Sequence, residues 1–162
     1  MPVQTEHRFP PGLSVLDAAG SRVTLADLRG QARAVAVNFM RTGTCPVCIH
    51  HARALARQDL PTHDVQPVVV VPGPPTHARV RRILGDRVTV VSSAGAQAHL
   101  AAGLHRTLLL QHSGIMLVGA VGVVRYRLAT ACPPAASTAR RCRPRSTGRN
   151  APTILPPRAA KG

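Results

Sequence analysis

Short apolar runs separated by turn residues dominate the first 128 positions of the chain. Residues 35–40 and 65–71 are rich in valine and too short for helices, so both predict strands. The second run is too apolar to alternate, which is typical of a strand covered on both faces in a parallel sheet. Pro67 lies near its start, and we expect strand pairing to begin after that proline, because proline has no N–H to donate.

A second set of residues follows a helical period. Cys48, Ala52 and Leu55 are spaced three or four apart with arginines between them, as on an amphipathic helix that packs on a sheet. Leu60-Pro61 should end this helix. Residues 76–84 predict another helix, with Val80, Ile83 and Leu84 as its apolar side, and the alanine-rich residues 94–104 predict a third.

The remaining predicted elements are an N-terminal hairpin with a short helical turn and three further strands. Residues 13–17 and 22–25 predict an N-terminal β-hairpin around a glycine-containing turn, followed by a brief helical turn over residues 25–30. The other strands are predicted at residues 88–92, 115–118 and 121–126. Alternating strands and helices with hairpins at both ends indicate an α/β sandwich with a mixed central sheet flanked by helices.

The last 34 residues differ in composition from the rest. Residues 129–162 consist mainly of Ala, Arg and Pro, and only Ile154 and Leu155 among them are large apolar residues. Such a segment cannot bury enough surface to offset its ordering entropy. We therefore expect one domain over residues 1–128 and a basic, disordered C-terminal tail over residues 129–162.

The most informative chemistry follows the strand at 35–40, where Thr42-Gly43-Thr44-Cys45-Pro46-Val47-Cys48 connects it to a helix. Pro46 is tolerated in a first helical turn, so Cys45 should lie at or just before the helix N-terminus. Unpaired N–H groups and the helix dipole favour a thiolate there. Cys48, one turn further on, is placed to attack a sulfur adduct on Cys45, which predicts a redox dithiol.

Other interpretations of the two cysteines stay open at this stage. Zinc could be held by Cys45, Cys48 and either His50 or His51, although a closed structural site needs four ligands. The remaining cysteines, Cys132 and Cys142, belong to the predicted tail. Inert core cysteines are a third interpretation. His50 and His51 are more typical of surface residues than of general bases, whereas Arg41, Arg53 and Arg57 could raise the local positive potential.

Charge is unevenly distributed along the chain, and this bears on whether the protein binds nucleic acid or anionic surfaces. The formal net charge is +15, and residues 87–162 hold eleven basic residues and no acid. Such a charge attracts nucleic acid or anionic surfaces. The chain has only Phe9, Phe39 and Tyr126 as aromatic platforms, so we expect no specific nucleic-acid binding.

No apolar run approaches the roughly 18 residues of a membrane-spanning helix, and the N-terminus lacks a basic patch followed by an apolar segment. We therefore expect a cytoplasmic protein without a membrane partner. In a reducing cytosol, a Cys-x-x-Cys pair is more typical of catalysis or metal binding than of a permanent bridge.

The order of these elements, together with Thr42-x-x-Cys45 and the closing strands, resembles the peroxiredoxin-like redoxins (the AhpC/TSA family) of the thioredoxin fold. The resemblance covers about residues 10–128 and implies that Cys45 is the peroxidatic nucleophile and that the Thr42 hydroxyl helps to orient the peroxide. Asn38 stands at the proline of the family motif Pro-x-x-x-Thr-x-x-Cys. The tail over residues 129–162 departs from the family, which usually ends in a helix packed on the sheet.

Two further departures concern the site. The family generally has an arginine just before the strand that precedes an Asp-x-x-Gly turn, whereas this chain reads His112-Ser113-Gly114-Ile115 there and has Gly119–Gly122 as the turn. Cys48 also follows Cys45 at the spacing seen in thioredoxins and glutaredoxins rather than in typical two-cysteine peroxiredoxins.

The sequence thus predicts a thioredoxin-like fold and a thiol-dependent oxidoreductase of peroxiredoxin-like type, with Cys45, Cys48 and Thr42 as its catalytic residues. It would reduce peroxide through the Cys-x-x-Cys dithiol, with no metal or organic cofactor. The expected partners are a peroxide or disulfide substrate and an external thiol reductant such as a thioredoxin-like protein, and a homodimer is one possible assembly. Two alternatives remain: a thiol-disulfide reductase without peroxidase activity, and a non-enzymatic basic binding protein with structural or zinc-binding cysteines.

Overall fold

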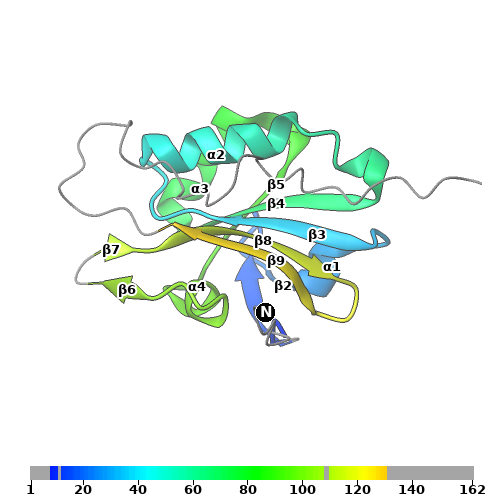
Figure 1. The fold of residues 1–162 in the computed structure, drawn as a ribbon. Helices are drawn as coiled ribbons and strands as arrows, with labels where there is room; N and C mark the ends of the chain where they lie inside the picture. The colour runs from blue at the N-terminus through cyan, green and yellow to red at the C-terminus, as the bar shows by residue number, and fades with distance from the viewer. Residues whose placement is uncertain (1–7, 11, 108–109, 131–162) are drawn as a thin grey trace, which may run out of the picture.

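The computed structural model describes residues 8–10, 12–107 and 110–130, and the predicted disordered tail lies outside these residues except for positions 129 and 130. The elements are arranged in layers (Figure 1). The helices are α1 (Leu25–Arg29), α2 (Pro46–Arg57), α3 (Pro74–Leu84) and α4 (Gln97–Ala101), with single 3-10 turns at Pro61–His63 and Gly85–Arg87. The strands are β1 (Ser14–Leu16), β2 (Arg22–Thr24), β3 (Ala34–Phe39), β4 (Val65–Val71), β5 (Thr89–Ser92), β6 (Arg106–Thr107), β7 (Leu110–Gln111), β8 (Ser113–Gly119) and β9 (Val124–Thr130).

Seven of these strands form one mixed sheet in the order β2-β1-β5-β4-β3-β8-β9. β3, β4 and β5 are parallel, because helical crossovers connect them, and the outer strands are antiparallel. The mixed sheet, the N-terminal hairpin and the flanking helices predicted from the sequence are therefore confirmed. The short β6–β7 pair was not predicted from the sequence.

β3 is the central strand, and all six of its residues are buried. Because side chains alternate along a strand, Ala34 and Ala36 face one helical layer, whereas Val35, Val37 and Phe39 face the other. Figure 1 shows α2 and α3 on one face of the sheet and α1 and α4 on the opposite face. Each face has its own apolar core, so the sheet separates two layers of packing.

α2 forms as its sequence predicts. Cys45 is the N-cap, Pro46 occupies the first turn, and the buried side chains are Cys48, Ala52 and Leu55. These three residues pack with Met40, Val69 and Val71 in the core between the sheet and the α2–α3 layer. The helix ends at Arg57, three residues earlier than Leu60-Pro61 predicted, and Pro61 instead begins a 3-10 turn.

The N-terminal hairpin and α1 also match the expectation. β1 and β2 pair in antiparallel register. Thr24 caps α1 through a capping box, in which its hydroxyl accepts from the Asp27 N–H and the Asp27 carboxylate accepts from the Thr24 N–H. These bonds lower the pKa of the Asp27 carboxyl, because the Thr24 side chain and backbone both donate to its ionised form. Gly30 ends the helix at φ 56°, a conformation that glycine adopts without strain.

The pairing of β4 around Pro67 differs in part from the sequence prediction. The register of β4 with β3 already includes Pro67, opposite Ala36, so the prediction that pairing begins after Pro67 is wrong on this side. The Ser93 N–H donates to the carbonyl of Val71, which shows that the odd-numbered residues of β4 direct their polar groups toward β5. The missing N–H of Pro67 therefore faces β5, whose pairing with β4 begins only at Val68.

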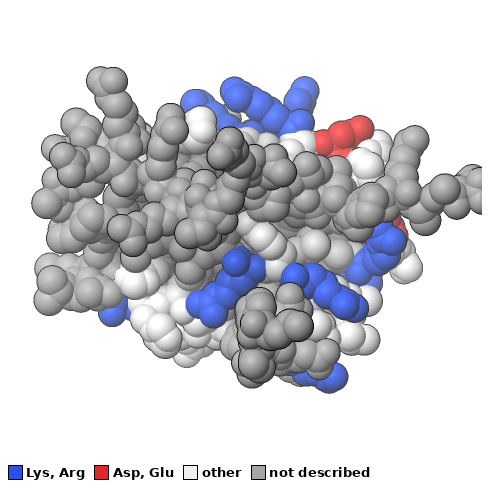
Figure 2. Space-filling view, viewed as in Figure 1, with Lys and Arg blue, Asp and Glu red and all other residues white. Residues whose placement is uncertain are grey.

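The predicted helix over residues 94–104 is also too long. The observed α4 covers only Gln97–Ala101, although the chain does turn at Gly103, where φ is 66°. Within the described ranges, no helix is long and apolar enough to cross a membrane. Figure 2 shows arginine side chains on the outer surface above α2, which carries the exposed Arg53 and Arg57.

We expect Leu55→Ala to lower the free energy of unfolding by about 2–5 kcal/mol, because it removes a side chain that is 1% exposed beneath α2. Leu100→Ala is the matched control, since this helical leucine is 50% exposed and its truncation should cost about 0.5 kcal/mol or less. Urea unfolding of the reduced proteins measures both values. Equal losses in the two variants would show that α2 is not held to the sheet by this contact.

Candidate functional site

Cys45 lies where the chain leaves β3 and begins α2. Its backbone is extended, with φ −68° and ψ 116°, and its Sγ accepts a hydrogen bond from the Cys48 N–H at 3.4 Å. That N–H is one of the donors that a helix N-terminus leaves without a main-chain partner. Cys45 is partly exposed, so the residue that receives this helix N–H also reaches the surface of the protein.

Cys48 is the buried member of the pair, with a side chain that is 3% exposed. Both cysteines are free thiols. The pKa of the Cys48 thiol is raised from its ordinary value of 9.0 to about 11, mainly by burial and also by the neighbouring Cys45, whereas hydrogen bonds from the backbone of Arg41 and Thr42 lower it. The two thiols therefore differ in their access to solvent.

Arg41 contacts the site mainly through its backbone. Its N–H donates to the Sγ of Cys48 at 3.3 Å, while its side-chain Nε donates to the carbonyl of Gln111 at 3.0 Å. The guanidinium thus ties the loop after β3 to the segment that enters β8. Sequence reasoning considered only the charge of Arg41 and missed the role of its amide, for which the sequence gives no signal.

Thr42 is exposed, and its hydroxyl is held within the turn. It pairs with the Thr44 hydroxyl at 3.2 Å and accepts from the Thr44 N–H at 3.4 Å. The carbonyl of Thr42 also accepts from the Cys45 N–H at 3.5 Å. The structure therefore places Thr42 three residues before Cys45 in one compact turn, with its hydroxyl at the surface.

Gly43 allows helix α3 to pack closely against this turn. A Cβ built at Gly43 would overlap the Cβ of Thr76, which lies in the first turn of α3. Only a residue without a side chain allows this close approach, so Gly43 lets α3 support the loop that carries Cys45. The loop glycine was visible in the sequence, but its partner, 33 positions away, was not.

Asn38 stands at the proline of the resembled motif and lies in β3 with a buried side chain. Along the strand it alternates in phase with Ala36 and Met40, which face the α2 layer. Within the described part of the chain, its Nδ2 has no hydrogen-bond partner. A buried amide donor without a partner is costly, and the position is therefore not explained by packing alone.

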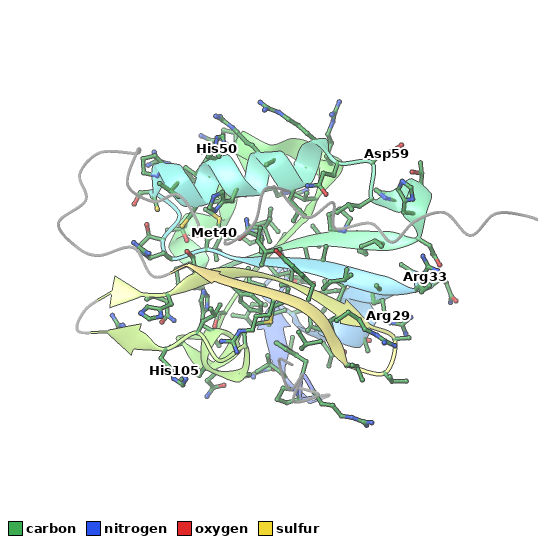
Figure 3. All side chains as sticks on the ribbon, in the orientation of Figure 1. Arg29, Arg33, Met40, His50, Asp59 and His105 are labelled. Atoms are coloured by element: carbon green, nitrogen blue, oxygen red, sulfur yellow. The ribbon has the colours of Figure 1, made fainter. Side chains whose placement is uncertain are left out.

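The histidines of α2 do not join the cysteines. His50 is exposed and lies on the outer side of α2, whereas Met40 lies between α2 and the sheet (Figure 3). His51 is partly buried, and burial together with the nearby His50 lowers its pKa. Among residues 8–10, 12–107 and 110–130, no group of three or more His, Cys, Asp or Glu side chains could hold a metal ion.

The segment before β8 is the place where the resembled family has an arginine. In this chain His112 occupies it, and its N–H donates to the carbonyl of His105 at 3.1 Å. The antiparallel register of β8 with β3 pairs Gly114 with Phe39, so this segment lies beside the loop that follows β3. Arg41, in the loop after β3, bonds to the carbonyl of Gln111 and so brings its guanidinium to this segment.

His99 is the second residue that sequence reasoning missed. It lies in α4, is fully buried, and its Nε2 donates to the carbonyl of Met40 at 2.8 Å. Its ring also packs edge-on against Phe39, with centroids 5.4 Å apart. A histidine in an alanine-rich helix was the available signal, because such helices are otherwise apolar on the buried side.

No protein-family model matches the sequence, and no curated protein matches it either. Solved structures do match. A cysteine-to-serine mutant of peroxiredoxin Q from Xanthomonas campestris has a TM-score of 0.63 at 15% identity, covering 75% of this chain and 83% of that one. Peroxidoxin BcpB from Mycobacterium tuberculosis has a TM-score of 0.60 at 17% identity, covering 72% of this chain and 80% of that one.

A hypothetical protein from Sinorhizobium meliloti 1021 is also similar, with a TM-score of 0.61 at 16% identity over 82% of this chain and 75% of that one. At such identities the likeness concerns the fold. The predicted thioredoxin-like architecture is thereby confirmed, and the chain has the fold of peroxiredoxin Q proteins.

Proposed function

We propose that the protein is a thiol-dependent oxidoreductase of peroxiredoxin-like type that reduces peroxides through Cys45 and Cys48. The observation that supports this most directly is the asymmetry of the pair. Cys45 is partly exposed at the helix N-terminus and accepts the Cys48 N–H, whereas the Cys48 sulfur is buried one turn behind it. A nucleophile at the surface with a second thiol beneath it suits capture of a substrate followed by internal disulfide formation.

In the first step, the Cys45 thiolate attacks one oxygen of a hydroperoxide. The O–O bond breaks, the sulfur takes the attacked oxygen as a sulfenic acid, and the other oxygen leaves as an alcohol or water after it gains a proton. Cys48 is unsuited to this step. At neutral pH a thiol with a pKa of about 11 is ionised in roughly one molecule in ten thousand.

In the second step, Cys48 loses its proton and its sulfur attacks the sulfur of Cys45. The S–O bond breaks, and the hydroxyl leaves as water with the proton from Cys48. Two thiols have then supplied the two electrons that reduced the peroxide. An external dithiol, such as a thioredoxin-like protein, returns the pair to the reduced state.

Thr42 has a proposed role in the first step. Its hydroxyl is exposed in the same turn as Cys45, and it can turn from Thr44 to donate to a peroxide oxygen at that sulfur. The resemblance to peroxiredoxins suggests this function, and the surface position of the hydroxyl is compatible with it.

A second candidate is a thiol-disulfide reductase without peroxidase activity. His112 stands where the resembled family has an arginine, and this favours the second candidate, because the permanent charge of an arginine is then missing just before β8. The Cys-x-x-Cys spacing at a helix N-terminus serves disulfide exchange equally well. In this case Cys45 attacks a substrate disulfide, and Cys48 resolves the mixed disulfide.

We expect Cys45→Ser to abolish peroxide consumption, because serine is not a comparable nucleophile at neutral pH. Cys48→Ser is the control and should still react once, leaving a sulfenic acid on Cys45 that dimedone traps. Both are compared with a parent that carries Cys132→Ser and Cys142→Ser, using stopped-flow mixing with hydrogen peroxide and, separately, with a small aromatic disulfide. Reduction of the disulfide alone would favour the second candidate, and full activity in Cys45→Ser would contradict both.

The Cys48 thiol should ionise at a higher pH than an exposed thiol does. In a Cys45→Ser protein that also lacks Cys132 and Cys142, the rate of Cys48 alkylation by iodoacetamide should rise with pH and reach half its maximum well above pH 9.0, because burial disfavours the thiolate. In urea the midpoint should return to about 9.0. Since the folded protein holds this proton more tightly than the unfolded chain, stability should fall between about pH 9 and 11. A folded-state midpoint below 9.0 would contradict the assigned burial.

Thr42→Val should slow the reaction with peroxide about tenfold or more, because it removes a hydrogen bond to the reacting oxygen, whereas Thr42→Ser should retain most of the rate. Thr44→Val is the matched control, since it breaks the same hydroxyl pair from the other side. Equal losses in Thr42→Val and Thr44→Val would assign Thr42 to the turn rather than to the chemistry.

A further inference from the structure

The peptide group between Met40 and Arg41 is hydrogen-bonded at both of its ends. Its carbonyl accepts from the Nε2 of His99 at 2.8 Å, and its N–H donates to the Sγ of Cys48 at 3.3 Å. The carbonyl and the N–H of a trans peptide point in opposite directions. One peptide just beyond the end of β3 therefore connects α4, on one face of the sheet, with α2 on the other.

Most of this connection is shielded from water, and only Arg41 is partly exposed. His99 and Met40 are 0% exposed, and Cys48 is 3% exposed. A hydrogen bond is electrostatically stronger in such surroundings than in water, and successive bonds polarise one another. A hydrogen bond to the Cys48 sulfur in these surroundings therefore has a larger effect on the free energy of its thiolate than the same bond would have in water.

The contacts of His99 fix its protonation state. A carbonyl oxygen only accepts, so the hydrogen of the neutral ring must be on Nε2. Burial lowers the pKa of His99, which keeps the ring neutral near pH 7. Its Nδ1 is buried and has no hydrogen-bond partner within the described ranges, and the edge-on contact with Phe39 holds the ring in place.

His77 shows what such a histidine looks like without a thiol nearby. It is also buried, and its Nε2 bonds to the carbonyl of Val90 in β5 at 2.7 Å. In the described part of the chain, no cysteine sulfur accepts a hydrogen bond from β5. The two histidines therefore make the same kind of bond, and only the bond of His99 continues to a sulfur.

We propose that His99 is a positioning residue that acts through the Met40–Arg41 peptide on Cys48. Its bond to the carbonyl polarises the peptide and holds the Arg41 N–H toward the sulfur, where this N–H stabilises the thiolate that forms when Cys48 attacks the Cys45 adduct. The catalytic importance of His99 rests on the proposed function, but its effect on the Cys48 thiol does not.

The physical reason is the cost of ionising a buried thiol. Desolvation has the largest effect on the pKa of Cys48 and disfavours the thiolate. The hydrogen bond from the Arg41 N–H is the strongest interaction that lowers this pKa. A hydrogen bond to a charged group is stronger than one between neutral groups, so polarising this donor favours the charged state selectively. Loss of the His99 bond should therefore affect ionised Cys48 more than neutral Cys48.

The test uses the full chain with Cys45→Ser, Cys132→Ser and Cys142→Ser, which leaves Cys48 as its single cysteine. His99→Leu removes the donor, and His99→Gln retains an N–H that can reach the Met40 carbonyl. His77→Leu and His77→Gln are the matched controls. For each variant, the rate of alkylation by iodoacetamide is measured as a function of pH, and circular dichroism reports whether it is folded.

We expect His99→Leu to lower the alkylation rate at a fixed pH below the midpoint by about two- to tenfold and to move the midpoint to higher pH. His99→Gln should stay close to the parent. His77→Leu should leave the midpoint unchanged, even where it lowers stability as much as His99→Leu does. An unchanged midpoint in folded His99→Leu, or an equal shift in His77→Leu, would overturn the proposal.

A second measurement needs no substitution of His99. Nitrogen-15 spectra of the same single-cysteine protein should show the Nε2–H tautomer of His99, and the Arg41 amide proton should shift as Cys48 titrates. The Nδ1–H tautomer would overturn the proposal. If these signatures appear but the native dithiol reduces neither peroxide nor disulfide, the proposed function fails while the link between His99 and Cys48 stands.

Discussion

The structure of the site depends on the short junction between the end of β3 and the start of α2. β3 is buried on both faces, so its position is set by the sheet and by two apolar cores. The loop that follows is then held by the Arg41 side chain on Gln111 and by Gly43 against Thr76. Because both ends of the loop are fixed, the start of the helix is fixed too, and the Cys48 N–H in its first turn donates to the sulfur of Cys45.

Local sequence was sufficient to predict this junction because its signals are short-range. A β-branched run, a Thr-Gly-Thr turn and Pro46 indicate strand, loop and helix start within a dozen residues. The three-and-four spacing of Cys48, Ala52 and Leu55 identified the side of α2 that is buried. Such features depend on backbone preference and periodicity, which a sequence displays directly.

Most of the features that sequence reasoning missed join distant segments. His99 and Met40 are 59 positions apart, and nothing in an alanine-rich helix indicates which carbonyl its histidine will meet. Pro67 was misjudged because its effect depends on which neighbouring strand its missing N–H faces, and that choice follows from strand order. The length of α4 was overestimated because propensity does not say where tertiary packing stops a helix.

The Met40–Arg41 peptide also bears on which redox state the protein favours. A thiolate is a strong hydrogen-bond acceptor, whereas a disulfide sulfur is neutral and accepts weakly. A donor aimed at Cys48 from a peptide that His99 polarises therefore stabilises the reduced, ionised dithiol relative to the disulfide. Burial acts against the same thiolate, and the Cys48 pKa of about 11 shows that burial prevails while both thiols are reduced. Where the pH is high enough to ionise Cys48 in the reduced protein, burial and the peptide donor therefore act on the reduction potential of this pair in opposite directions. Near pH 7 the reduced sulfur is a neutral thiol, so both act mainly on the rate at which Cys48 forms the attacking thiolate.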